Sequence, residues 1–99
     1  MFARVSRYRG DADRLLAGFE SVRAELEQLE GFAQAFFLTD RDNSRAMSIT
    51  LWESEAALQA SAERAHRMRT QASEPADASI EAVESYDVPL TVKPAARAG

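Results

Sequence analysis

The chain has 99 residues, of which 45% are hydrophobic and 28% are charged, a composition typical of a single globular domain rather than of disorder. The formal charge of −4 argues against nucleic acid as the main partner, and the absence of cysteine excludes disulfides, thiolate metal sites and a cysteine nucleophile. No stretch has the apolar length of a signal-peptide core or a membrane span, so we expect a cytoplasmic protein with no membrane partner.

A strand and a helix are predicted first. Residues 1–8 alternate loosely between two faces, as a strand does, and Gly10 ends the pattern. Asp11 or Asp13 can cap the helix that follows. Apolar residues recur there at spacings of three and four and form one stripe: Leu15, Phe19, Val22, Leu26 and Leu29. Gly18 inside this helix costs about 1 kcal/mol relative to alanine, which predicts a close backbone contact.

Two strands are predicted over residues 32–38 and 46–52, joined by a polar hairpin loop. The first of them is apolar on both faces, which predicts that something covers both faces. We assign Phe36 to the core face, and Phe37, with Val83 of the last strand, to the opposite face.

A second helix is predicted from the N-cap Ser54. One face of it carries Leu58, Ser61, Ala62, Ala65, Arg69 and Ala72, and most of these residues are small. Either this helix lies close on the sheet or it leaves space beneath it. A loop over residues 70–79, a last strand over residues 80–88 and a tail follow, and we expect residues 95–99 to be frayed.

The predicted order β-α-β-β-α-β is that of an α+β, ferredoxin-like fold with a four-stranded antiparallel sheet. We expect one such domain over residues 1–94. Because the two helices can cover only one face of the sheet, the second apolar face predicts a homodimer that packs sheet against sheet.

The junction Ile49–Ala60, ITLWESEAALQA, places a strand, a tryptophan and a capped helix in direct succession. With the hairpin before it, this junction resembles the antibiotic biosynthesis monooxygenase superfamily, over roughly residues 1–88. The resemblance implies a dimeric α+β barrel with a ligand cavity in each subunit, between the sheet and its helices. It also implies, for an enzyme, cofactor-independent oxidation of a phenolic or quinol-like polyketide.

The haem-degrading branch of that superfamily pairs an asparagine on the first strand with a tryptophan and a histidine on the second helix. This chain has no asparagine on the first strand, and Ser61 stands near the tryptophan position, so only His66 could match. The resemblance therefore does not extend to haem degradation, and we expect no cofactor and no metal.

Two residues are candidates for catalysis. His66, the only histidine, could act as a general base, or it could be a boundary residue without chemistry. Trp52, the only tryptophan, could form a wall on which an aromatic ligand stacks, or it could close the end of the core. Arg69 falls on the apolar face of its helix, so it either faces a cavity or extends towards solvent.

The expected ligand is a small aromatic molecule. The residues expected to bind it are Tyr8, Phe36, Ser48, Thr50, Trp52, Leu58, Ala62, Arg69 and Tyr86. A cofactor-independent monooxygenase is the first functional hypothesis. The alternative is a non-catalytic dimeric module that binds a ligand or a partner.

Overall fold

One antiparallel sheet and one layer of helices make up the fold, in a computed structural model that describes residues 1–96. The elements are β1 (Phe2–Arg9), α1 (Ala12–Glu27), β2 (Phe32–Asp40), the 3₁₀ helix η1 (Arg41–Asn43), β3 (Arg45–Trp52), α2 (Glu55–Ala60), α3 (Ala62–Ser73) and β4 (Ser79–Asp87). The sheet order is β2-β3-β1-β4 and every pair of neighbouring strands is antiparallel. This arrangement confirms the predicted ferredoxin-like fold. The expectation that residues 95–99 are frayed falls partly on residues 97–99, which lie outside the described residues.

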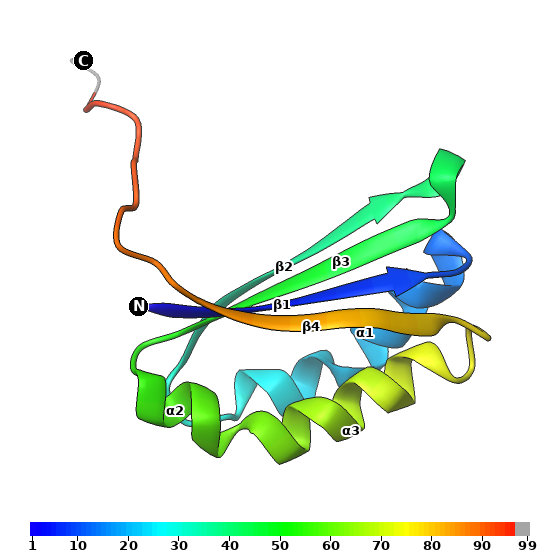
Figure 1. Ribbon diagram of the computed structural model, residues 1–99, viewed down its shortest axis with the longest axis horizontal. Coiled ribbons are helices and arrows are strands. Elements are labelled where there is room, and N and C mark those ends of the chain that lie inside the picture. Colours follow the sequence, from blue (N-terminus) through cyan, green and yellow to red (C-terminus); the bar gives the residue numbers. More distant parts are fainter. Residues whose placement is uncertain (97–99) are drawn as a thin grey trace.

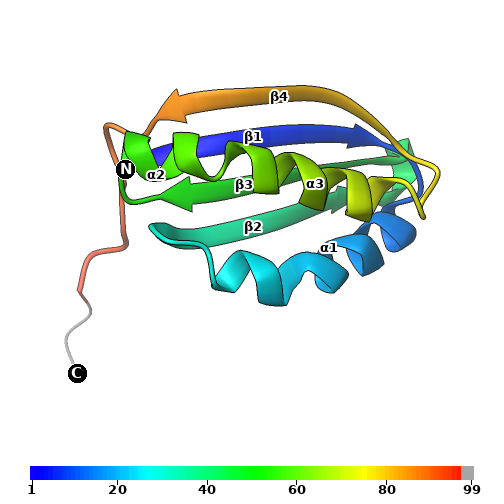
Figure 2. The same cartoon turned by 90° about the horizontal axis from the view of Figure 1, so that it is seen from below.

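Helices α1, α2 and α3 lie on one side of the sheet, and η1 lies at the tip of the β2–β3 hairpin (Figure 1). Seen from that side, α2 and α3 run over β1 and β3, and α1 runs along β2 (Figure 2). None of the described helices is long and apolar enough to cross a membrane. The opposite side of the sheet, which we call the outer face, carries no element of the described chain.

The close contact predicted at Gly18 is confirmed. A Cβ added at Gly18 would overlap the carbonyl oxygen of Ala72, so α1 and α3 pack backbone against backbone at this point. The Asp11 side chain caps α1 by accepting a hydrogen bond of 2.9 Å from the backbone N–H of Arg14. After α1, Gly31 has φ +77°, the left-handed conformation that suits a glycine at the stop after a helix.

The second helix is divided at Ser61, where the sequence predicted one continuous helix. The carbonyl oxygen of Leu58 accepts hydrogen bonds from Nη2 of Arg4 at 2.7 Å and from Oγ of Ser61 at 2.8 Å. These donors compete with the backbone N–H that would continue the helix. The positive charge of Arg4 also complements the negative end of the α2 dipole.

The prediction assigned the two faces of β2 the wrong way round. Phe37 lies opposite Ser48 on the helix side of the sheet and stacks on Phe19 with ring centroids 4.6 Å apart. Phe36 lies opposite Ile49 on the outer face and is 48% exposed. Side chains that alternate along a strand fall into two sets, one on each face of the sheet, but the alternation does not show which set the helices cover.

Val83 was also assigned to the wrong face, because it lies opposite Ser6, whose side chain is buried on the helix side. A second apolar face nevertheless exists, built from the other residue set. Its members are Val5, Phe36, Leu38, Met47, Ile49, Leu51 and Tyr86. Phe36, Leu38 and Tyr86 are each close to half exposed, so this outer face leaves large apolar side chains uncovered in the single chain.

Candidate functional site

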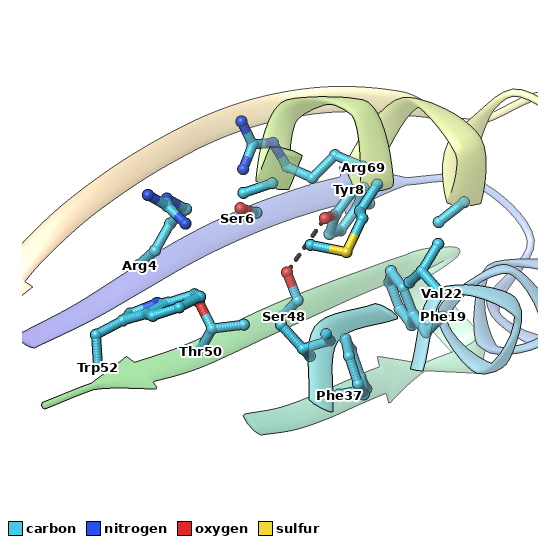
Figure 3. A pocket seen from close by; sticks show the side chains of 14 residues that line it. Arg4, Ser6, Tyr8, Phe19, Val22, Phe37, Ser48, Thr50, Trp52 and Arg69 are labelled. Carbon is cyan, nitrogen blue, oxygen red and sulfur yellow. Dashed lines mark hydrogen bonds between the residues drawn. The ribbon is translucent and has the colours of Figure 1, made fainter. Parts of the chain in front are cut away.

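A small pocket lies between the helix side of the sheet and helices α1 and α3 (Figure 3). Its walls are mainly aromatic and aliphatic, and five polar side chains interrupt them: Arg4, Ser6, Ser48, Thr50 and Arg69. The cavity volume is about 40 Å³. A cavity needs roughly 10–15 Å³ to hold one water molecule, so this pocket has room for a few water molecules and not for a whole aromatic ligand.

Trp52 forms one wall of the pocket from the end of β3. Its side chain is 0% exposed, and its ring meets the edge of Phe32 at a centroid distance of 5.7 Å. The indole Nε1–H donates to Oγ1 of Thr50 at 3.0 Å, so this donor is already used. The ring therefore closes the core and also borders the pocket, and its stacking against an aromatic ligand stays a prediction.

Tyr8 brings a hydroxyl group to the pocket from β1. The residue is 2% exposed, its ring packs edge-on against Phe19, and its hydroxyl lies 3.1 Å from Oγ of Ser48 (dashed line in Figure 3). Burial raises the pKa of Tyr8, so the phenol stays neutral. Two hydroxyls that share one hydrogen bond keep a second O–H donor, which can serve a ligand in the cavity.

Two arginines lie at the same end of the pocket, Arg4 on β1 and Arg69 on α3 (Figure 3). Arg4 is 6% exposed, and its guanidinium carbon lies 5.7 Å from the ring centroid of Trp52. Nε of Arg69 is buried and has no hydrogen-bond partner among residues 1–96. Burial lowers the pKa of both arginines, and the nearby positive charge of Arg69 lowers that of Arg4 further. Arg69 is partly buried and lines the pocket, so its side chain borders the cavity while part of the residue stays accessible to solvent.

A wider groove with a volume of about 500 Å³ lies outside the pocket, bordered by β4 and by α2 and α3. Phe2, Leu58, Ala62 and Val83 contribute apolar surface to it, and both arginines line it as well. Arg4 and Arg69 therefore border both the pocket and the groove.

The structure brings together most, but not all, of the residues expected to bind a ligand. Five of them line the pocket: Tyr8, Ser48, Thr50, Trp52 and Arg69. Leu58 and Ala62 line the groove instead. Tyr86 borders the groove, but it lies opposite Ala3, so its ring belongs to the outer face.

Phe36 and His66 line neither the pocket nor the groove. Phe36 belongs to the outer face, and His66 is on the exposed side of α3, away from the buried Ala65 and Met68. The catalytic role expected for His66 has no support from this placement.

Arg4 and Ser6 are the polar pocket residues that the sequence interpretation missed. The signal was present, since Arg4 shares its strand face with Tyr8, a residue already expected in the site. A charged residue on a strand face that also carries expected pocket residues indicates either a paired ion or a polar site.

Among residues 1–96, no group of three or more histidine, aspartate or glutamate side chains is placed to hold a metal ion.

The sequence and the fold were compared with those of known proteins. Residues 1–73 match the family model described as antibiotic biosynthesis monooxygenase. The structure is similar to SnoaB, a cofactor-independent oxygenase from Streptomyces nogalater, with a TM-score of 0.72 and 18% identity over 92% of this chain and 95% of that one. It is also similar to the monooxygenase ActVA-Orf6 of Streptomyces coelicolor, solved in complex with nanaomycin D, with a TM-score of 0.68 and 17% identity over 95% of this chain and 92% of that one.

A third similar structure is the heme-degrader MhuD from Mycobacterium tuberculosis, solved with two hemes bound in its active site. Its TM-score is 0.72 at 21% identity, over 94% of this chain and 100% of that one. No curated protein sequence gives a match. At such low identities the structural likeness shows the fold alone. The family model matches most of the chain, including the strand, tryptophan and helix junction that carried the predicted resemblance. This chain therefore belongs to the antibiotic biosynthesis monooxygenase family.

Proposed function

We propose that the protein binds a small aromatic molecule in the groove beside α2 and α3, with the reacting end of the molecule in the pocket beneath α3, and oxidises it with dioxygen, without a cofactor. The observation that carries this proposal is the pocket itself, in which aromatic walls formed by Trp52 and Phe37 face the hydroxyls of Tyr8 and Ser48. Family membership supports the reaction class, as do the cofactor-independent oxygenase SnoaB and the nanaomycin-bound ActVA-Orf6 among proteins of the same fold.

The reaction needs few chemical groups from the protein. An electron-rich aromatic anion, formed when the substrate releases a proton to solvent, reduces dioxygen directly. At a benzylic CH₂ group the overall balance is R₂CH₂ + O₂ → R₂C=O + H₂O, so the substrate supplies all of the electrons. The protein has to orient the substrate against Trp52 and exclude water. The Tyr8–Ser48 pair donates an O–H to the oxygen that becomes negative during the reaction.

The small cavity favours a second candidate, a non-catalytic module that binds its ligand in the groove. A volume of about 40 Å³ beneath α3 does not enclose an aromatic ring, whereas the groove of about 500 Å³ has room for one. Such a module would bind aromatic ligands without consuming dioxygen, so a single assay distinguishes the two candidates.

The assay measures dioxygen consumption with anthrone, a tricyclic substrate that carries one benzylic CH₂ group. We expect consumption above the uncatalysed rate, with one anthraquinone formed for each dioxygen. Tyr8→Phe should lower the rate about 100-fold, because it removes a hydrogen-bond donor used during the reaction. Ser21→Ala, which removes an exposed hydroxyl from α1, should have no effect.

Two results would count against this account of the enzyme. Consumption at the uncatalysed rate, together with measurable ligand binding, would select the non-catalytic module. A rate that drops in His66→Ala but not in Tyr8→Phe would move the chemistry to the exposed histidine predicted from the sequence.

The protein also acts, in this proposal, as a homodimer that packs outer face against outer face. Helices cover only one side of the sheet, and the outer face exposes Phe36, Leu38 and Tyr86. Beyond β4 the tail adds Leu90 and Val92, which are 75% and 82% exposed. A second copy of the chain buries this apolar surface. This burial adds hydrophobic stabilisation to a chain whose single core is small.

A further inference from the structure

We infer that the ligand carries a carboxylate, and that this group binds between the guanidinium groups of Arg4 and Arg69, which border both the pocket and the groove. The inference rests on the proposed function, because it names the chemical class of the molecule bound there: a monoanionic aromatic carboxylate. Three features of the structure support it.

The first feature is the distribution of charge. Six other arginines lie within 4.0 Å of a carboxylate on the surface: Arg7, Arg9, Arg23, Arg41, Arg45 and Arg64. Arg4 and Arg69 have no such partner among residues 1–96, although they are more sheltered than any of these six. Arg14 and Arg67 also have no carboxylate partner among residues 1–96, but both are exposed to solvent, so Arg4 and Arg69 are the sheltered arginines without a countercharge. Two sheltered cations side by side repel each other, and an anion between them removes that cost.

The second feature is the supply of free donors. Arg4 uses Nη2 on the carbonyl oxygen of Leu58 at 2.7 Å and Nη1 on Oγ of Ser61 at 3.2 Å, which leaves part of its five N–H groups free. Arg69 offers its buried Nε–H, which has no partner in the described chain. A carboxylate has two oxygens with about four acceptor positions, and it matches the planar fork of a guanidinium group.

The third feature is what surrounds the two charges. On the groove side, Leu58, Ala62 and Val83 provide apolar surface for a ring. Glu55 and Asp87 also line the groove without pairing with either arginine. These two acids disfavour a second negative group on the ligand, which is why we assign a single carboxylate on an otherwise neutral aromatic molecule.

The test compares 2-naphthoate with its neutral isostere 2-naphthamide by isothermal titration calorimetry. We expect the wild-type protein to bind the carboxylate about tenfold more tightly than the amide. Arg69→Gln should abolish this preference by weakening the binding of naphthoate alone. Arg69→Lys, which keeps the charge, should retain part of the preference. Arg67→Gln is the matched control, because it removes an exposed arginine from the same helix.

The outcomes separate this inference from the proposed function. Equal affinity for the acid and the amide, or a preference that survives in Arg69→Gln, would overturn the carboxylate assignment and leave aromatic binding in place. Tighter binding of 2-naphthyl phosphate than of 2-naphthoate would also overturn it, in favour of a phosphate ligand. Failure to bind any of these ligands would refute both the inference and the proposed aromatic site.

Discussion

Replacing Trp52 by alanine is expected to lower the free energy of unfolding by about 3–5 kcal/mol, the usual cost of truncating a large buried aromatic side chain. The ring is 0% exposed and belongs to the core cluster that contains Val22, Leu26 and Met68. It also contacts the edge of Phe32 at 5.7 Å and the guanidinium group of Arg4 at 5.7 Å. Domains of this kind have total stabilities of about 5–15 kcal/mol, so the loss takes a large share.

The measurement is urea unfolding followed by far-UV circular dichroism, since the variant has no tryptophan left for fluorescence. Trp52→Phe is the matched control, because it keeps an aromatic ring and gives up only part of the volume and the hydrogen bond to Thr50. A loss below about 1 kcal/mol in Trp52→Ala would show that the ring is not a main support of the core.

Introducing a charge at Phe36 is expected to dissociate the proposed homodimer. Phe36→Glu places a carboxylate on the outer face, beside Ile49, and in a symmetric dimer both copies bring this charge to the interface. Like charges and unpaired charges in an interface cost several kcal/mol, which corresponds to a dimer about a thousandfold weaker. The monomer should still fold, because Phe36 is 48% exposed in the single chain.

Light scattering after size exclusion at micromolar concentration measures this effect. The wild-type protein should show twice the chain mass of 10.9 kDa, and Phe36→Glu should show the mass of one chain. Leu16→Glu is the control, since Leu16 is 43% exposed and lies on α1, on the helix side of the sheet. A wild-type protein that runs as a monomer, or a dimer that persists in Phe36→Glu, would contradict the outer face as the dimer interface.

The element order was predictable from the sequence because its signals are local. The cap at Asp11, the glycines at 18 and 31 and the strand alternation each act within a few residues. The division of the second helix was not predictable in this way. It depends on Arg4, which lies 57 residues before Ser61 in the sequence and meets it only in the folded chain.

The candidate site was predictable only in part, for the same reason. Ser48 and Thr50 were placed in it because alternation put them on the same strand face as Trp52, and Tyr8 because its phenol could supply a hydroxyl to a pocket. Alternation could not show which face of β2 the helices would cover, so Phe36 was wrongly placed in the core. The position of His66 on its helix was ambiguous in projection, and packing of Ala65 and Met68 against the core turned it outwards.

The most direct test of ligand binding beneath α3 is a titration of the ¹⁵N-labelled protein with 2-naphthoate, followed by ¹H–¹⁵N NMR spectra. We expect the largest shifts at the Nε–H of Arg69 and at the single indole N–H of Trp52, with shifts at the backbone of Arg4 and Ser6. The outer-face residues Phe36 and Leu38 should not respond. Shifts concentrated on the outer face, with the signals of Trp52 and Arg69 unchanged, would show that the ligand binds elsewhere and that the space under α3 is only a packing defect.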